Sequence, residues 1–285
     1  MLYSAPTLAD RKWDRLAEFV SSPKFQYGRR IFVLDFDGTT APIVDLPSQA
    51  APDPVMKIVF NRLVAKSSLA ILSGRPVDFL RHRLAFLSDA VKPNDVLLFG
   101  HYGLERTTIG SVDSQVARII PEELEELSDL KQRWLANPVP EIYFEDKGYS
   151  CAFHFRNSVE YKEQLFDWID KNLEQRGLVA RLGKMVVEVV PSSSPTKVSI
   201  IREFAKQYDS VVFAGDDLGD LDSFIELERE RDLGLSRFSI LVEGGFETPP
   251  ELLVSCDLKV ESPMKLALVL DRMVNRLPKE ASELS

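Results

Sequence analysis

The feature that most constrains the fold is an apolar run at residues 31–34 that ends in two carboxylates, Asp35 and Asp37, followed by Gly38. Such a run of β-favouring residues predicts a strand covered on both faces, as in a parallel sheet. Carboxylates at its end are costly to bury unless positive charge meets them. A divalent cation would supply that charge, and one carboxylate could then attack phosphorus. A plain strand followed by a turn is the simpler interpretation of the same residues.

Three further segments place polar groups beside predicted strands or helices. Each has a structural interpretation of its own, as a turn, a helix start or a helix cap. Three of the four segments fall at strand C-termini, however, and open α/β sheets bind their ligands there. The polar residues are Ser73 after strand 69–72, Lys197 at the start of helix 196–207, and Asp216, Asp217 and Asp220 after strand 210–214.

The order of predicted elements indicates an α/β chain interrupted by an insertion. Strands and helices alternate up to residue 104, whereas hairpin-like strand pairs follow, which is typical of an α+β unit. The alternation resumes after the Pro- and Ser-rich segment 191–195. We therefore predict a discontinuous core of residues 1–104 and 191–285, with a cap of residues 105–190. The expected cap elements are strands 105–109, 141–146, 149–156, 178–182 and 185–190 and helices 121–136 and 159–175.

Two predicted cap strands have one apolar face and one charged face. Alternation along strand 149–156 puts Cys151, Phe153 and Phe155 on the apolar side and His154 and Arg156 on the other. In 184–190, Lys184, Val186 and Glu188 share a face. The charged faces suit either a ligand or plain solvent exposure, and the alternation alone leaves both open.

Composition excludes several classes of partner. The 285 residues are 45% hydrophobic, enough for a real core, and the net charge is −9. This acidic balance without a long basic run argues against nucleic acid and against anionic membranes. Cys151 and Cys256 are too few for a disulfide framework, so we expect reduced, buried thiols. With no signal-peptide pattern at the N-terminus, we expect a cytoplasmic protein.

Taken together, the four segments resemble the four motifs of the haloacid dehalogenase (HAD) superfamily of phosphatases. Additional residues narrow the resemblance to the trehalose-6-phosphate phosphatase family, and it extends from about residue 30 to 275. The chain departs from that family at Tyr102, where histidine is usual, and at Gly219 and Leu221, where threonine and glutamate are usual. The narrowing residues are the segments 103–105, 153–156 and 183–191.

The resemblance implies a fold and a site. The fold is a HAD-like, Rossmannoid parallel-sheet core with an inserted α+β cap. Asp35 would be the nucleophile and Asp37 the general acid and base, with Ser73 and Lys197 on the phosphate. Mg²⁺ would be bound by Asp35, the backbone carbonyl of Asp37, Asp216 and Asp220, with Asp217 as an alternative to Asp220. The substrate-binding residues would be Arg75, Glu105, His154, Arg156, Lys184 and Glu188. For Arg75, cap closure and a structural role are equally open.

The function implied is hydrolysis of trehalose 6-phosphate to trehalose and phosphate, in trehalose biosynthesis, by a monomer or weak oligomer. The first alternative is the same chemistry on sucrose phosphate or another sugar phosphate. The second is a phosphosugar-binding regulator without turnover. A receiver domain is excluded because such domains lack an inserted cap and the second aspartate of the first motif.

Overall fold

The computed structural model describes residues 8–44, 46–88, 96–173, 177–183, 185–243 and 256–278. The chain forms two compact units: Met1–Val116 with Thr196–Ser285, and Ala117–Pro195. The second unit is therefore inserted in the sequence of the first. Within the described ranges, every helix is too short or too polar to cross a lipid bilayer.

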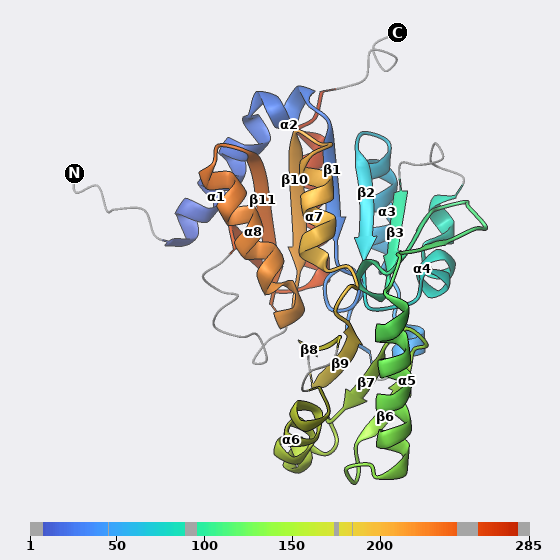
Figure 1. Cartoon of the computed structure of the whole chain (residues 1–285). Coiled ribbons are helices and arrows are strands. Elements are labelled where there is room, and N and C mark those ends of the chain that lie inside the picture. Colours follow the sequence, from blue (N-terminus) through green and yellow to red (C-terminus); the bar gives the residue numbers. More distant parts are fainter. Residues whose placement is uncertain are drawn as a thin grey trace. The chain divides into compact units, whose positions relative to one another are not determined.

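The first unit is built on a sheet that has eight strands in the described part of the chain, in the order β12-β11-β10-β1-β2-β3-β4-β5. Figure 1 labels the central strands β11, β10, β1, β2 and β3 side by side. Neighbours from β12 to β3 are parallel, whereas β3, β4 and β5 pair antiparallel. The strands are β1 (Arg30–Leu34), β2 (Ser68–Leu72), β3 (Val96–Gly100), β4 (Glu105–Thr108), β5 (Gln115–Val116), β10 (Ser210–Gly215), β11 (Ser236–Val242) and β12 (Leu258–Val260).

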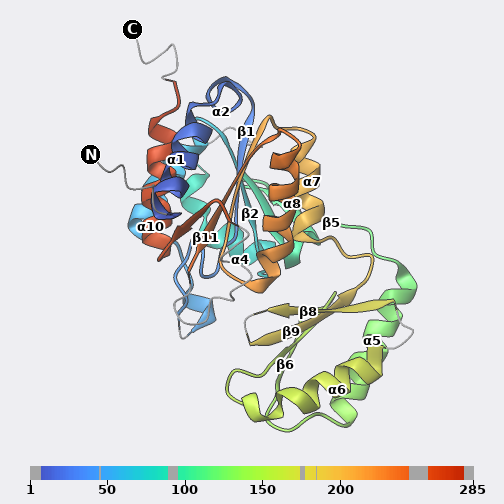
Figure 2. The same cartoon turned by 90° about the vertical axis from the view of Figure 1, so that its left-hand side faces the viewer.

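Helices cover both faces of this sheet (Figure 2). Phe32 and Leu34 pack into one hydrophobic cluster and Ile31 and Val33 into another, on opposite faces of β1. This double burial is why β1 is apolar throughout rather than alternating. The helices are α1 (Leu8–Ser21), α2 (Pro23–Tyr27), α3 (Pro54–Val64), α4 (Val77–Arg83), α7 (Lys197–Ala205), α8 (Leu221–Asp232) and α10 (Pro263–Asn275).

The strand order positions the candidate site. β1 lies between β10 and β2, so the carboxyl ends of these three strands are adjacent. The polar segments after them are far apart in the sequence but leave the sheet at the same edge. The α/β fold class predicted from the sequence is confirmed by this arrangement.

The second unit is an antiparallel sheet in the order β6-β7-β9-β8 with helices on it. Cys151, Phe153 and Phe155 join the buried cluster of this unit, and Val187 and Val189 of the facing strand join it too. The predicted apolar face of both strands is therefore confirmed. The elements are α5 (Pro121–Ala136), β6 (Tyr143–Asp146), β7 (Cys151–His154), α6 (Lys162–Leu173), β8 (Leu178–Gly183) and β9 (Val186–Pro191).

The structure differs from the sequence prediction at several places, of which the following bear on the domain boundary and the helices. Residues 105–116 extend the core sheet through β4 and β5, and the compact inserted unit begins only at Ala117 and ends at Pro195. The expected helix 159–175 is a 3₁₀ turn, Val159–Tyr161, followed by α6. Helix α8 was not predicted, because its many charged residues hide its apolar side.

Candidate active site

The loop after β1 is held tightly against the strand end. The Asp35 amide donates to the Ala214 carbonyl at 2.9 Å, which extends the pairing of β1 with β10. Thr40 Oγ1 donates to the backbone carbonyl of Asp35 at 2.9 Å. Gly38 has φ +78°, and a Cβ there would overlap Oδ2 of Asp216. Only glycine fits this position, because both its backbone and the space around it exclude a side chain.

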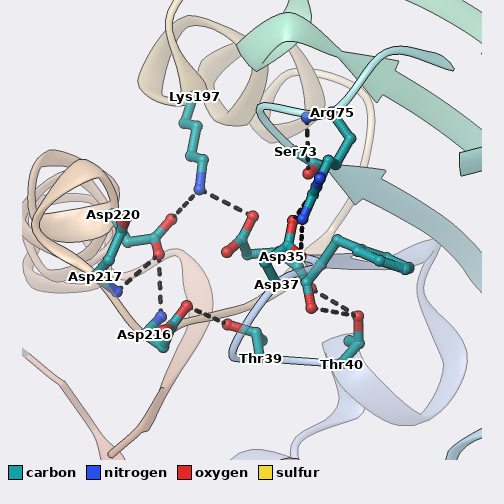
Figure 3. Close-up of polar contacts among 11 residues, drawn as sticks. Asp35, Asp37, Thr39, Thr40, Ser73, Arg75, Lys197, Asp216, Asp217 and Asp220 are labelled. Atoms are coloured by element: carbon teal, nitrogen blue, oxygen red, sulfur yellow. Dashed lines mark hydrogen bonds and ion pairs between the residues drawn. The ribbon is translucent and has the colours of Figure 1, made fainter. Parts of the chain in front are cut away.

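Three buried carboxylates, those of Asp35, Asp216 and Asp220, gather at this edge of the sheet (Figure 3). Each offers an oxygen within 4.8 Å of the oxygens offered by the other two. Asp220 Oδ2 accepts hydrogen bonds from the amides of Asp216 and Asp217 at 3.0 and 3.3 Å. Thr39 Oγ1 donates to Asp216 Oδ1 at 3.1 Å. The carboxylates are thus oriented by the protein itself.

Lys197 is the buried cation of the site and the first residue of α7. Its position is set by a capping box in which Thr196 Oγ1 accepts from the Ser199 amide at 3.1 Å. The ammonium lies 3.1 Å from Asp35 Oδ1 and 2.6 Å from Asp220 Oδ1. Lys197 therefore joins the end of β1 to the turn that follows β10.

Burial and mutual repulsion work against charge on these carboxylates. Burial raises the pKa of Asp35 well above its usual range, although Lys197 opposes the rise. Burial, with neighbouring carboxylates adding to it, raises the pKa of Asp216 to about 8 and that of Asp217 to about 6. Burial also opposes the charge of Lys197, but Asp220 and Asp35 more than offset it and raise the pKa of the ammonium.

The site fits a divalent cation. Three buried carboxylates face one buried ammonium, so the cluster is short of positive charge. In addition, Asp217 Oδ1 is buried and has no hydrogen-bond partner among the described residues. The available ligand atoms are all oxygens, the donor type that Mg²⁺ prefers. Asp35, Asp216 and Asp220 could hold such an ion.

Asp37 lies next to the cluster but has a different partner. Arg75 Nε and Nη2 donate to its two carboxylate oxygens, each at 2.8 Å, in a forked ion pair. The guanidinium also lies 4.9 Å from the centroid of the Phe79 ring. The structure thus gives Arg75 a direct contact with the predicted acid–base residue. The fork occupies one lone pair on each Asp37 oxygen, so the remaining lone pairs can still exchange a proton with a ligand.

The side chains of Ser73 and Glu105 both accept hydrogen bonds from backbone amides of the loop that runs from the end of β2 to the start of α4. Ser73 is buried, and its Oγ accepts a hydrogen bond from the Arg75 amide at 3.1 Å. Glu105 Oε2 accepts from the Val77 amide, the first residue of α4, at 2.9 Å. Glu105 was expected in the cap, but it begins β4 in the first unit, and its carboxylate is bonded to this loop.

In the second unit, the polar face of the sheet carries two sets of hydrogen-bonded side chains, one around Glu188 and one formed by His154 and Glu145. Glu188 is buried, and it accepts from Ser150 Oγ at 2.6 Å and from Lys147 Nζ at 3.2 Å. His154 Nε2 lies 2.9 Å from Glu145 Oε2. The pairing of Ala152 with both Glu145 and Glu188 puts these groups on one face.

The other two residues expected at the substrate are Arg156 and Lys184. Arg156 follows β7 and is exposed. Lys184 lies outside the described residues.

Sequence reasoning missed three residues that contact the site. Thr39 and Thr40 are fully buried hydroxyl residues directly after the first motif, and that polarity in a buried loop was an available signal. Tyr102 was noted only as a departure from a family pattern. Its ring lies beside Lys197, with the ammonium 5.7 Å from the ring centroid.

Comparison with known proteins gives concordant matches. The family model described as trehalose-phosphatase matches residues 33–245. A bifunctional trehalose-6-phosphate synthase/phosphatase of Thermoproteus tenax is 31% identical over 208 residues, which are 69% of this chain and 27% of that protein. A trehalose-phosphate phosphatase of Mycobacterium ulcerans is 28% identical over 201 residues, 67% of this chain and 49% of its own length. The chain thus spans about half or less of the length of these relatives.

Solved structures share the fold. The C-terminal domain of C. albicans trehalose-6-phosphate phosphatase superposes with a TM-score of 0.70 at 21% identity and covers 97% of this chain and 100% of that one. The C-terminal domain of the Candida albicans trehalose synthase regulatory protein superposes with a TM-score of 0.62 at 15% identity, covering 90% and 97%. At these identities the likeness supports the architecture rather than a particular activity.

Proposed function

Because the chain belongs to the trehalose-phosphatase family, we propose that it is a Mg²⁺-dependent phosphatase that hydrolyses trehalose 6-phosphate to trehalose and phosphate. The observation that carries the proposal is the convergence of Asp35, Asp216 and Asp220 around the ammonium of Lys197 at one edge of the sheet. These residues come from three segments that are distant in the sequence, and together they provide a nucleophile, acidic metal ligands and a phosphate-facing cation.

The first step is attack by a carboxylate oxygen of Asp35 on phosphorus. The bond between phosphorus and the sugar oxygen breaks, an aspartyl-phosphate forms, and Asp37 gives a proton to the leaving oxygen. In the second step Asp37 takes a proton from water, whose oxygen attacks phosphorus and releases Asp35. Acid–base help of this kind is worth about 10²–10⁴-fold. The Arg75 fork orients Asp37 and leaves one lone pair on each of its oxygens for the proton.

Other residues hold the transferring group. Ser73 donates to a phosphate oxygen, and Lys197 supplies a fixed positive charge beside the nucleophile. Mg²⁺, held by Asp35, Asp216, Asp220 and the backbone carbonyl of Asp37, would neutralise charge on the phosphoryl group when bound. Asp217 is the alternative ligand to Asp220, since both oxygens of Asp220 already accept hydrogen bonds.

The polar sheet face of the second unit is the proposed sugar-recognition surface. Carboxylates and a histidine suit a polyol, because each carboxylate accepts hydrogen bonds from hydroxyls. Glu188 and His154 lie on that face, and Arg156 and Lys184 belong to the same proposed set. Glu105 contributes through the loop of the first unit. The proposed substrate is thus a sugar phosphate. We further propose that the protein is cytoplasmic and is a monomer or a weak oligomer.

A regulator that binds a phosphosugar without turnover is the second candidate, and one observation favours it. A structure whose name describes a regulatory protein shares this fold. The presence of Asp35, Asp37, Ser73, Lys197 and Asp216 in this chain supports turnover instead.

Phosphate release from a panel of sugar phosphates, with and without Mg²⁺, tests the proposal. We expect trehalose 6-phosphate to be hydrolysed with a kcat/KM at least about 100-fold above that of glucose 6-phosphate or sucrose 6-phosphate. Equal rates on trehalose 6-phosphate and glucose 6-phosphate would contradict the proposed substrate. Binding of the sugar phosphates without release of phosphate would favour the regulator.

Glu188→Gln tests the sugar-recognition surface. The amide keeps the side-chain volume and an acceptor for Ser150 but loses the charge. We expect KM for trehalose 6-phosphate to rise about tenfold, while kcat/KM for p-nitrophenyl phosphate, which carries no sugar, stays within about twofold. Glu125→Gln, on an exposed position of α5 in the same unit, is the matched control. Equal losses on both esters would place the effect of Glu188 on the fold rather than on the sugar.

A further inference from the structure

We propose that Tyr102 is a positioning residue that holds the ammonium of Lys197 against its ring and fixes the Ser73–Gly74 turn beneath it. This inference rests on the proposed phosphatase function, because it concerns how two of its phosphate-binding groups are kept in place. The contacts described below all lie within the first unit.

The backbone at Tyr102 is held in an unusual conformation. His101 and Tyr102 have φ values of +47° and +58°, and Gly103 follows with +102°. A bulky residue rarely adopts this left-handed region, and such outliers persist only where the surroundings impose them. The surroundings here are the loop after β2, since the amides of Tyr102 and His101 donate to the carbonyls of Ser73 and Arg75 at 2.8 and 3.0 Å.

The ring itself packs on that loop. A Cβ built on Gly74 would lie 2.7 Å from both Cζ and Oη of Tyr102, so the phenol covers the glycine backbone. The neighbouring Ser73 carbonyl accepts the Tyr102 amide. Backbone and side chain of one residue therefore hold both sides of the turn that presents the Ser73 hydroxyl.

The same ring attracts Lys197. The ammonium lies 5.7 Å from the ring centroid, within the range of a cation–π interaction. Asp35 and Asp220 form ion pairs with this ammonium. The ring adds a further attraction to the ammonium and does not need to accept a hydrogen bond from it. The neutral phenol ring does so without adding a charge to the site.

Substitutions at Tyr102 separate the ring from the backbone. In Tyr102→Leu the ring is lost, and we expect kcat to fall about tenfold for both trehalose 6-phosphate and p-nitrophenyl phosphate, the size of a desolvated cation–π interaction. Tyr102→Phe keeps the ring and should restore kcat to within about threefold of wild type. Asparagine suits the left-handed backbone better than leucine does. Tyr102→Asn should therefore lose as much activity as Tyr102→Leu, while its melting temperature should not be lower than that of Tyr102→Leu. Tyr27→Leu, at an exposed tyrosine of α2, is the matched control.

A double-mutant cycle with Lys197 tests the coupling directly. The measured quantity is the affinity for orthovanadate, a phosphate mimic. It is obtained as an inhibition constant for variants that turn over substrate, and by calorimetry for variants that have little turnover. Tyr102→Leu should weaken binding about tenfold in the wild-type background and by a clearly smaller factor with Lys197→Met, where only the loss at the Ser73–Gly74 turn remains. Equal losses in both backgrounds, or equal loss in Phe and Leu variants, would overturn the proposal. If Lys197→Met does not fold, the Phe, Leu and Asn series still decides.

The outcomes separate this inference from the function on which it rests. A wild-type chain that releases no phosphate from either ester overturns both. A wild-type chain that hydrolyses both esters, with a leucine variant as active as wild type, overturns the role of Tyr102 alone.

Discussion

Asp35→Asn should abolish phosphate release, lowering kcat by at least about 10⁴-fold, because the amide has no charged oxygen to attack phosphorus. The fold should remain intact. Burial raises the pKa of Asp35 in the folded chain, so folding disfavours its charged form, and removing that charge does not weaken the native state. Lys197 keeps Asp220 as a partner in the variant. Phosphate release and the thermal unfolding midpoint are the two measurements.

The control for this prediction is a nearby carboxylate outside the cluster. Asp222 is exposed on α8, two positions beyond Asp220, and Asp222→Asn should keep kcat within about twofold of wild type. A rate for Asp35→Asn within tenfold of wild type would exclude Asp35 as the nucleophile. A large fall in its unfolding midpoint would instead assign the lost activity to the fold.

Removal of the metal is the second change with a large expected effect. Treatment with EDTA should lower kcat by at least about 10³-fold, and excess Mg²⁺ should restore it, because the phosphoryl charge would then face three buried carboxylates balanced by Lys197 alone. Asp216→Asn should raise the Mg²⁺ concentration needed for half-maximal rate at least tenfold. Full activity in EDTA would contradict the metal assignment.

The binding of Mg²⁺ should also depend on pH. Burial and neighbouring carboxylates raise the pKa of Asp216 to about 8 in the metal-free site, so below pH 8 the ion must displace a proton from it. The dissociation constant, measured by calorimetry, should therefore tighten as pH rises from 6 to 8, by up to tenfold per unit for one proton. The dependence should flatten above pH 8. A dissociation constant that is constant over this range would contradict competition between the proton and the ion.

Much of the first unit could be predicted because its signals are local. The run at residues 31–34 is apolar throughout because β1 is covered on both faces. In β7 and β9, by contrast, alternation correctly separated the apolar from the polar face. The prediction failed where local pattern and tertiary role differ. The strand at residues 105–109 was predicted as the start of the cap, but β4 and β5 add to the edge of the core sheet.

For the site, the sequence identified which residues carry polar chemistry but not their partners. The motif residues Asp35, Lys197, Asp216 and Asp220 converge as expected. The forked pair of Arg75 with Asp37 and the bond from the Val77 amide to Glu105 were not foreseen. Each joins residues on different segments, so no spacing within one segment reports it.

By itself, the sequence determined the strands, the double burial of β1 and the placing of carboxylates at strand ends, because these follow from the burial of apolar side chains and from backbone preferences within a few residues. Only the tertiary structure decided which groups meet: Asp37 with Arg75, Glu105 with the start of α4, and Tyr102 with Lys197. The physical reason is that such contacts act over a few ångströms, and the order of strands in the sheet sets which distant segments come that close.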